Sequence, residues 1–267
     1  MKILVTGATG NVGRMVVDEL LALGADDVRA LTVDPERAAL PAGVEVVRGF
    51  LGKVETLPAA LQGVDVMYLA PHIPTVFEAC RLAADAGVGR IVDLAGAKGD
   101  HWQEVEDGVE ASGVPFTHLE PGEFMANTGI WAEQIRAGDV VRDAYPEAAT
   151  AVIAQEDIAA VAAKVLVTDG HVGKSYELTG PESLNRREKV ERIGRALGRE
   201  LVYVDLPRDA AVQQFALAMG EYSEWYLDGL AQLVGHPQAA LPTVAELLGR
   251  PAMTLEEWAR RHADMFR

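Results

Sequence analysis

Cysteine is nearly absent from this chain of 267 residues, which contains Cys80 alone. A single cysteine excludes an internal disulfide framework and is typical of a reducing compartment. Cys80 lies in a helical pattern, which indicates a small core residue rather than a nucleophile. The sequence also lacks any run of about eighteen apolar residues, so we predict no membrane-spanning segment. The amino terminus leads straight into a strand without a basic leader, and we therefore expect a cytoplasmic protein.

Positive charge is scarce as well. The chain has 24 lysine and arginine residues against 40 aspartate and glutamate residues, a formal net charge of −16. Such a chain repels the phosphate backbone of nucleic acids, so we expect no nucleic-acid partner. Its content of 49% hydrophobic and 24% charged residues is that of an ordinary globular protein. The length allows one large domain or two small ones.

The first thirteen residues contain the most informative pattern. Ile3–Val5 is a short apolar run that predicts a buried strand, and Gly7, Gly10 and Gly13 follow it at a spacing of three. A helical pattern then begins at Asn11. A strand, a glycine turn and a helix in this order bring backbone N–H groups and a helix N-terminus to one point, which stabilises an anionic diphosphate. The pattern predicts dinucleotide binding, with a plain structural turn as the alternative.

Strands and helices alternate through the first half of the chain. Further strands are predicted at Val28–Val33, Val44–Val47, Val64–Leu69, Arg90–Leu94 and Phe116–Leu119. Helices are predicted at 75–86 and 101–112, and Asp34 and Pro35 should open a short helix as N-cap and first residue. This alternation predicts an α/β fold with a parallel sheet covered on both faces.

The second half is less regular and mostly helical. Residues 122–155 show no clean period, and a helix follows that has Asp157 near its start. Lys174–Leu178 predicts one more strand, and Leu201–Val204 a short one. Further helices are expected at 208–219 and 221–234. Capping boxes are expected to open two more helices, and their residue pairs are Asn185 with Glu188 and Thr254 with Glu257.

Motifs along nearly the whole chain resemble the NmrA-like family of atypical short-chain dehydrogenases. They include Thr6-Gly-Ala-Thr-Gly10, Gly63-Val-Asp-Val-Met-Tyr-Leu69, Gly87-Val-Gly-Arg-Ile-Val92, Ala111-Ser-Gly-Val-Pro-Phe-Thr117, Pro121-Gly-Glu-Phe-Met-Ala-Asn127, Asp157-Ile-Ala-Ala-Val161, Tyr176-Glu-Leu-Thr-Gly-Pro-Glu182 and Glu257-Trp258. The resemblance implies a doubly wound Rossmann core over 1–125 with 150–180. A smaller, mostly helical C-terminal substrate lobe would comprise 126–149 and 181–267.

The resemblance also implies a site for NADPH or NADH, and this chain departs from the family at the adenosine end. Val33 stands where an arginine usually binds the 2′-phosphate, and Phe50 stands where an aspartate usually meets the adenine edge. Arg29, Arg37 and Asp34 lie nearby in the sequence. We therefore expect weak discrimination between NADH and NADPH. The expected cofactor-binding residues are Gly7, Ala8, Thr9, Gly10, Asn11, Val12, Gly13, Thr32, Val33, Asp34, Arg37, Phe50, Leu51, Ala70 and Pro71.

Conventional short-chain dehydrogenases use a Tyr-x-x-x-Lys pair to supply a proton, and no tyrosine of this chain has a lysine four positions later. The serine expected after the fifth strand is also missing. Candidate catalytic residues at the ends of strands are His72, Lys98 and His101, each with a plain surface or packing role as the alternative. Weaker candidates are Glu106, His118 and Glu120. No histidine or cysteine pair has the helical spacing of a zinc site, so we expect no metal.

A substrate pocket is expected between the end of the sixth strand and an aromatic helix. Its candidate residues are Phe124, Met125, Asn127, Trp131, Tyr222, Trp225 and Tyr226, although aromatic residues at this spacing more often belong to a core. The main hypothesis is an oxidoreductase that moves hydride to a small, quinone-like or aromatic carbonyl acceptor, which needs little proton relay. The alternatives are a non-catalytic redox sensor and a non-redox enzyme for dehydration or coupling.

Overall fold

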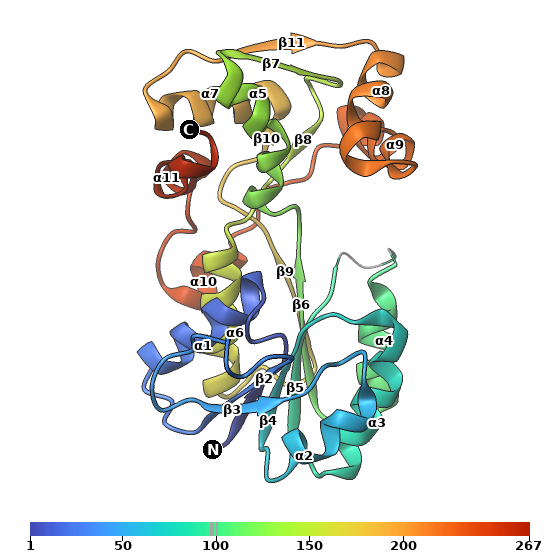
Figure 1. The fold of residues 1–267 in the computed structure, drawn as a ribbon, viewed down its shortest axis with the longest axis vertical. Coiled ribbons are helices and arrows are strands. Elements are labelled where there is room, and N and C mark those ends of the chain that lie inside the picture. The colour runs from blue at the N-terminus through green and yellow to red at the C-terminus, as the bar shows by residue number, and fades with distance from the viewer. Residues whose placement is uncertain (97–98, 100) are drawn as a thin grey trace. The chain divides into compact units, whose positions relative to one another are not determined.

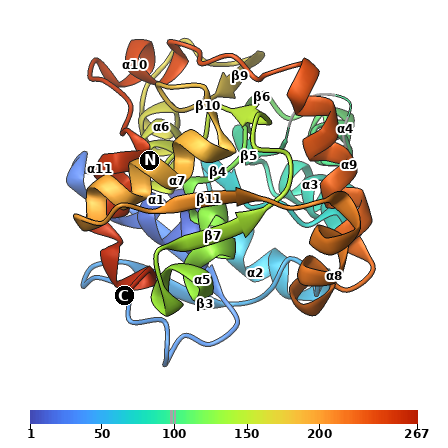
Figure 2. The ribbon, with the colours of Figure 1, turned by 90° about the horizontal axis from the view of Figure 1, so that it is seen from above.

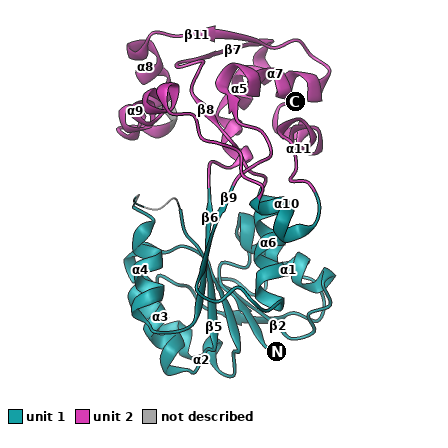
Figure 3. Ribbon diagram, turned by 180° about the vertical axis from the view of Figure 1, so that it is seen from behind, with its two compact units in different colours: residues 1–121, 155–178, 243–250 teal, residues 122–154, 179–242, 251–267 magenta. Residues whose placement is uncertain are grey.

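A computed structural model describes residues 1–96, 99 and 101–267. The chain forms two compact units, which are coloured separately in Figure 3. Unit 1 comprises Met1–Pro121, Gln155–Leu178 and Thr243–Arg250, and unit 2 comprises Gly122–Ala154, Thr179–Pro242 and Pro251–Arg267. No helix among the described residues is long and apolar enough to cross a membrane.

Unit 1 contains a seven-stranded sheet with the order β3-β2-β1-β4-β5-β6-β9, in which every pair of neighbours is parallel. The strands are β1 (Ile3–Val5), β2 (Val28–Thr32), β3 (Glu45–Arg48), β4 (Val66–Leu69), β5 (Arg90–Leu94), β6 (Phe116–Pro121) and β9 (Lys174–Leu178). The order reverses direction at β1 and β4, so the loops after these strands diverge and leave room for a ligand at their carboxyl ends.

Helices cover both faces of this sheet (Figure 1). One face carries α1 (Asn11–Ala22), α6 (Gln155–Val167) and α10 (Thr243–Leu248), and the other carries α2 (Leu57–Leu61), α3 (Val76–Asp85) and α4 (Gln103–Ala111). A buried cluster fills the second interface, where Leu31 and Ile91 of the sheet meet Ala79 of α3 and Val105 of α4. Burial of these apolar side chains on both faces is what stabilises a parallel sheet.

Unit 2 is mostly helical. Its helices are the 3₁₀ segments η3 (Met125–Trp131) and η4 (Ala263–Met265) and the α-helices α5 (Ala132–Ala137), α7 (Arg186–Leu197), α8 (Arg208–Met219), α9 (Tyr222–Gly235) and α11 (Leu255–Arg261). The strands β7 (Val140–Asp143) and β11 (Val202–Asp205) pair in parallel and lie side by side in Figure 2. A second pair, β8 (Ala149–Thr150) and β10 (Leu184–Asn185), is antiparallel. The core of this unit includes Trp131, Trp258 and Phe266, all fully buried.

The predicted doubly wound α/β fold with a smaller helical lobe is confirmed, and both capping boxes are present at the starts of α7 and α11. The short helix expected at Asp34 and Pro35 is wrong, because that segment forms a turn. Asp34 pairs there with Arg37 at 3.6 Å, and Ala39 has a positive φ of 47° that a helix does not allow. The unpredicted α2 and α10 are only five and six residues long, too short to produce a clear period.

Candidate functional site

The turn between β1 and α1 is built from glycine. Gly7 has a φ of +59°, and its carbonyl oxygen accepts a hydrogen bond of 2.8 Å from the Gly10 amide. Gly10 is the N-cap of α1 and has no side chain to occupy the helix end, and the first turn of α1 contains no acidic residue. The helix therefore begins without a side-chain acceptor of its own, which leaves its positive end open to an anion.

Side chains have no room in this turn. A Cβ atom on Gly13 would lie 2.2 Å from the carbonyl oxygen of Gly7, and one on Gly7 would lie 2.9 Å from the Cβ of Ala70. The Thr6 hydroxyl fixes the turn to β4, because it donates to the Tyr68 carbonyl at 3.0 Å and accepts from the Ala70 amide at 2.8 Å. The close approach of α1, β1 and β4 thus depends on glycine at these positions.

A pocket of about 300 Å³ opens beside this turn, at the carboxyl ends of β1, β2 and β4. It brings together eight of the residues expected to bind cofactor, which are Gly7, Thr9, Thr32, Val33, Phe50, Leu51, Ala70 and Pro71. It also includes Leu31 and Gly49, which sequence reasoning missed, and His72, which was expected to be catalytic. Gly10, Asn11, Val12 and Gly13 lie at the adjoining start of α1, and Ala8 is fully buried beneath it.

His72 and Phe50 form one wall of the pocket. Their rings meet edge to face, with centroids 5.3 Å apart and planes at 80°. The His72 Nδ1 lies 2.8 Å from the Thr75 hydroxyl, which itself donates to the Leu51 carbonyl at 2.8 Å. Phe50 is 43% exposed and Val33 is 59% exposed, so the pocket presents two bare apolar surfaces. Such surfaces suit a flat ring with an apolar face.

Three arginines belong to β2, to the turn after it and to β3, and the structure gives each a different environment. Arg29 is buried and donates to the carbonyls of Ala60 and Gln62, so it faces away from the pocket. Arg37 is exposed on the turn beside Asp34. Arg48, at the end of β3, donates to the Val33 carbonyl at 3.1 Å. Sequence reasoning missed Arg48, although the parallel pairing of β2 with β3 was a signal that would place it there.

The other catalytic candidates lie around β5 and β6. His101 is exposed and its ring packs on Trp102 at a centroid distance of 4.5 Å. Lys98 lies outside the described residues. Glu106 is buried in α4 and accepts a hydrogen bond of 2.9 Å from Gln103, and burial raises its pKa above the ordinary value. Of the described residues in this group, His101 is open to solvent and Glu106 is not.

His118 is enclosed between β5 and α4, where it forms a buried ion pair. Its Nδ1 lies 2.6 Å from the Asp93 carboxylate, its Nε2 faces Glu110 at 3.5 Å, and its ring stacks on Phe116. Burial raises the pKa of Asp93 despite the pairing with His118. Burial alone would lower the pKa of His118, but the hydrogen bond and the charge of Asp93 raise it above the ordinary value. This pair contributes to the packing of the sheet rather than to an open site.

The residues expected to line a substrate pocket all lie in unit 2, in different environments. Met125 and Trp131 are buried in its core, and Phe124 is half-buried. The Trp131 indole donates to Asp143 at 2.6 Å, and Asp143 also binds the buried Arg186. Tyr226 is half-buried against this group and accepts from Arg186 at 3.1 Å. In contrast, Asn127, Tyr222 and Trp225 are exposed.

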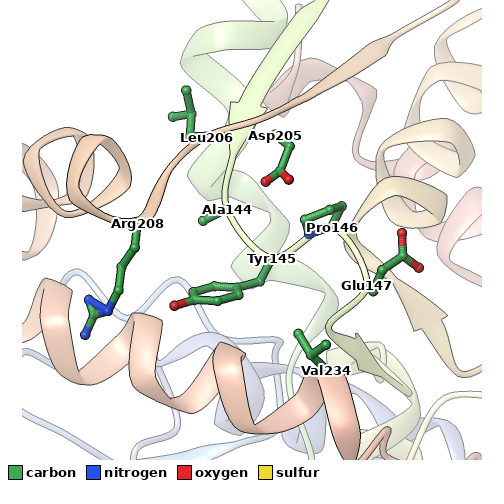
Figure 4. Close-up of a pocket in the computed structure, with 8 residues that line it drawn as sticks. All are labelled: Ala144, Tyr145, Pro146, Glu147, Asp205, Leu206, Arg208 and Val234. Carbon is green, nitrogen blue, oxygen red and sulfur yellow. The ribbon is translucent and has the colours of Figure 1, made fainter.

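A pocket of about 260 Å³ in unit 2 is lined by Ala144, Tyr145, Pro146, Glu147, Asp205, Leu206, Arg208 and Val234. Figure 4 shows the Tyr145 ring directed toward Arg208. Tyr145 has a positive φ of 54°, in a turn that Asp143 fixes by accepting from the Ala144 amide at 2.7 Å. None of the residues expected to bind substrate lines this pocket.

Comparison with known proteins identifies the family. The family profile described as NAD(P)H-binding matches residues 7–169 of the chain. A (4-alkanoyl-5-oxo-2,5-dihydrofuran-3-yl)methyl phosphate reductase of Streptomyces griseus is 40% identical, over 99% of this chain and 99% of its own length. The chain belongs to the NAD(P)H-binding, NmrA-like family of atypical short-chain dehydrogenases.

Other relatives in this NmrA-like family are reductases too. An NAD(P)H azoreductase of Xenophilus azovorans is 33% identical over 99% of both chains. The crystal structure of an NADPH-dependent quinone oxidoreductase of Escherichia coli superimposes with a TM-score of 0.84 and 26% identity, and covers 98% of this chain and 99% of that one.

The geometry of this NmrA-like chain fits a nicotinamide dinucleotide. Helix α1 begins at Gly10 without a side-chain cap, and added Cβ atoms at Gly7 and Gly13 would collide with their neighbours. An uncapped helix start next to bare glycine backbone is what a diphosphate requires. The adjoining pocket offers the apolar surfaces of Val33 and Phe50 to the remainder of such a ligand.

Proposed function

We propose that this chain is an NAD(P)H-dependent reductase that transfers hydride to a small, flat, electron-poor acceptor. The observation that carries the proposal is the pocket at the ends of β1, β2 and β4, whose floor is the glycine turn before α1. When bound, the reduced nicotinamide supplies the hydride. The chain's own contribution would be to bind the cofactor, to orient the acceptor and to exclude water.

The residues of this pocket divide into two groups by their chemistry. The backbone of Gly7, Gly10 and Gly13, with Asn11 and Val12 at the start of α1, would hold the diphosphate. The adenosine portion would lie against Thr32, Val33, Phe50 and Leu51, with Arg37 and Arg48 at the rim. Ala70 and Pro71 would continue the wall from the end of β4. Thr9 would belong to the adenosine side of the pocket, because its hydroxyl lies 3.2 Å from that of Thr32.

The acceptors in the names of the relatives have one chemical feature in common. A quinone, an azo compound and a 4-alkanoyl-5-oxo-2,5-dihydrofuran each contain a π-system made electron-poor by carbonyl groups or by nitrogen. Hydride addition to such a system leaves a delocalised anion, which is less basic than an alkoxide. We therefore propose an acceptor of this class, because it suits a chain without a Tyr-x-x-x-Lys pair.

Different residues are candidates for donating the proton and for contacting the acceptor. His101 is exposed on the loop after β5 and is the candidate acid among the described residues. The exposed rings of Tyr222 and Trp225 and the exposed amide of Asn127, all residues of unit 2, are candidate contacts for the acceptor, and Phe124 and Tyr226 are half-buried. Flat acceptors stack on such rings at low entropic cost.

A panel of acceptors tests the proposal. Quinones, azo dyes and unsaturated lactones with an acyl substituent are each incubated with NADH and with NADPH, and acceptor-dependent oxidation of the cofactor is measured with identification of the product. We expect turnover of at least one class, and loss of turnover in Gly10→Val, where a branched side chain occupies the helix start. Tight cofactor binding with no reduction of any acceptor would overturn the reductase and leave a redox sensor. The relatives, named as reductases, favour the enzyme.

A further inference from the structure

We propose that His72 reads the adenine base of the cofactor, by accepting a hydrogen bond from the exocyclic amino group through Nε2. The inference rests on the proposed dinucleotide site and assigns to His72 a specificity role in place of the catalytic role expected from the sequence. It starts from the composition of the pocket wall, in which Thr9, Thr32 and His72 carry the polar side chains among the described lining residues. The two threonine hydroxyls contact each other at 3.2 Å, and His72 adds a ring nitrogen, Nε2, to the polar groups of the wall.

The hydrogen bonds around His72 fix the tautomer of its neutral ring. The Thr75 hydroxyl has one hydrogen and donates it to the Leu51 carbonyl at 2.8 Å. At its contact of 2.8 Å with His72 Nδ1, the same hydroxyl can therefore only accept. Nδ1 must carry the proton, so Nε2 presents a lone pair. Among the described residues Nε2 has no hydrogen-bonding partner, and His72 is only half-buried.

The surroundings of Nε2 match an aromatic base better than a substrate undergoing reduction. The Phe50 ring stands at 80° to the His72 ring, and its exposed face belongs to the same pocket as Val33. Gly52 lets the two rings pack this closely on the loop after β3, because a Cβ there would lie 2.4 Å from Phe50 and 3.0 Å from His72 Nε2. A flat heterocycle against Phe50 with its amino edge toward His72 uses both features. The pocket also includes the end of β2, the side expected for adenosine.

Base recognition can be separated from catalysis by changing the base. Nicotinamide hypoxanthine dinucleotide phosphate has a carbonyl where NADPH has the amino group. Its carbonyl oxygen is a hydrogen-bond acceptor and cannot donate to His72 Nε2, which is also an acceptor. Dissociation constants of both reduced cofactors are measured by calorimetry for the wild type, for His72→Ala and for His236→Ala, a surface histidine in unit 2 that serves as the control. We expect the wild type and the control to prefer NADPH by about three- to tenfold, the range of one hydrogen bond. His72→Ala should bind both cofactors within about twofold of each other.

Thr75 provides a second test that keeps the imidazole in place. Thr75→Val removes the hydroxyl that holds Nδ1 and should reduce the preference for NADPH, whereas Thr75→Ser should retain it. A preference for NADPH that persists in His72→Ala would overturn the inference. Failure of the wild type to bind either cofactor would instead overturn the proposed function.

Discussion

Gly10 and Gly13, in the turn after β1, are subject to different constraints, and replacing each by alanine should reveal the difference. A Cβ on Gly13 would lie 2.2 Å from the carbonyl oxygen of Gly7, inside any tolerable contact. A Cβ on Gly10 would lie 3.2 Å from the same oxygen, a tight contact that a small shift relieves. Gly13 thus serves the packing of the turn on the helix, and Gly10 serves the space in front of it.

We predict that Gly13→Ala lowers the free energy of unfolding by about 1–3 kcal/mol, the usual cost of overpacking, and abolishes NADPH binding. Gly10→Ala should weaken NADPH binding while stability changes less, because its methyl group projects into the ligand space. Urea unfolding and calorimetric titration of both variants measure the two effects. Equal losses of stability in the two variants would contradict this division of roles.

Val33 is the residue where cofactor choice should be adjustable. Its side chain is 59% exposed, it lines the pocket, and Arg48 reaches only its carbonyl oxygen. We predict that Val33→Arg increases the preference for NADPH over NADH by about 1.5–3 kcal/mol, the range for a hydrogen bond to a charged group. The ratio of the two dissociation constants is the measurement, and Val33→Gln is the uncharged control. An unchanged ratio in Val33→Arg would mean that residue 33 does not face the 2′ position.

At the scale of single elements, β5 and β6 are joined by the buried pair of Asp93 and His118. Both side chains are essentially inaccessible. Glu106 and Glu110 of α4 add negative charge around the imidazole, and Glu120 of β6 adds negative charge around Asp93 and Glu106. Burial opposes the charge on His118, but the Asp93 carboxylate outweighs it and raises the pKa of His118. Protonated His118 is therefore more favourable in the folded chain than in the unfolded one.

We predict a pH-dependent stability that originates at this pair. A raised pKa contributes stability that is complete below the unfolded histidine value of about 6.5 and is lost as pH rises through the folded value. The free energy of unfolding should therefore fall from about pH 6.5 upward in the wild type. His118→Gln keeps a hydrogen-bond donor near Asp93 without the titration, and its profile should be flatter in that window. Denaturant unfolding at a series of pH values measures this, and parallel profiles would contradict it.

Elements with local signals were predictable, and elements that depend on distant pairing were not. The bounds of β5 and β9 match the prediction because both are short strands bounded by turn residues. The strand β7 was missed because its partner β11 lies some 60 residues later, where Val202 pairs with Val140, and no local period marks it. Asp34 and Pro35 combine two helix-start signals, but the contacts of Asp34 with Arg37 and of Arg14 with the Ala39 carbonyl stabilise a turn instead.

Within the candidate site, the spacing of the glycines predicted the turn. The pocket wall could not be predicted, because it depends on the conformation of the loops after β3 and β4. The sequence places His72 at the end of β4, where a catalytic role is a reasonable expectation. Only the conformation of the loops after β3 and β4 shows that Leu51, Thr75 and His72 are linked by hydrogen bonds in one wall. Trp131 and Met125 follow β6, where a residue in contact with substrate is expected, but both side chains are buried in the core of unit 2.

At the scale of the whole molecule, the net charge of −16 would oppose an anionic cofactor, while Arg37, beside Asp34, and Arg48, which donates to the carbonyl of the pocket residue Val33, would attract it locally. The Debye length decides whether distant charges or only nearby ones act on the cofactor. It falls from about 30 Å at 0.01 M salt to about 8 Å at 0.15 M. At low salt most of the net charge repels the ligand, and at higher salt only the nearby arginines remain effective.

We therefore predict that the association rate constant of NADPH rises between 0.01 M and 0.15 M sodium chloride, conditions whose Debye lengths are about 30 Å and 8 Å. Stopped-flow fluorescence of the bound cofactor measures the rate. Arg48→Gln should lower the rate at both salt concentrations and keep its upward slope, because the long-range repulsion is unchanged. Asp18→Asn, a surface charge on α1 paired only with Arg14 at 3.2 Å among the described residues, is the control for the loss of one charge elsewhere. A rate that falls with salt in the wild type would show that the arginine rim, rather than the net charge, governs the approach of the cofactor.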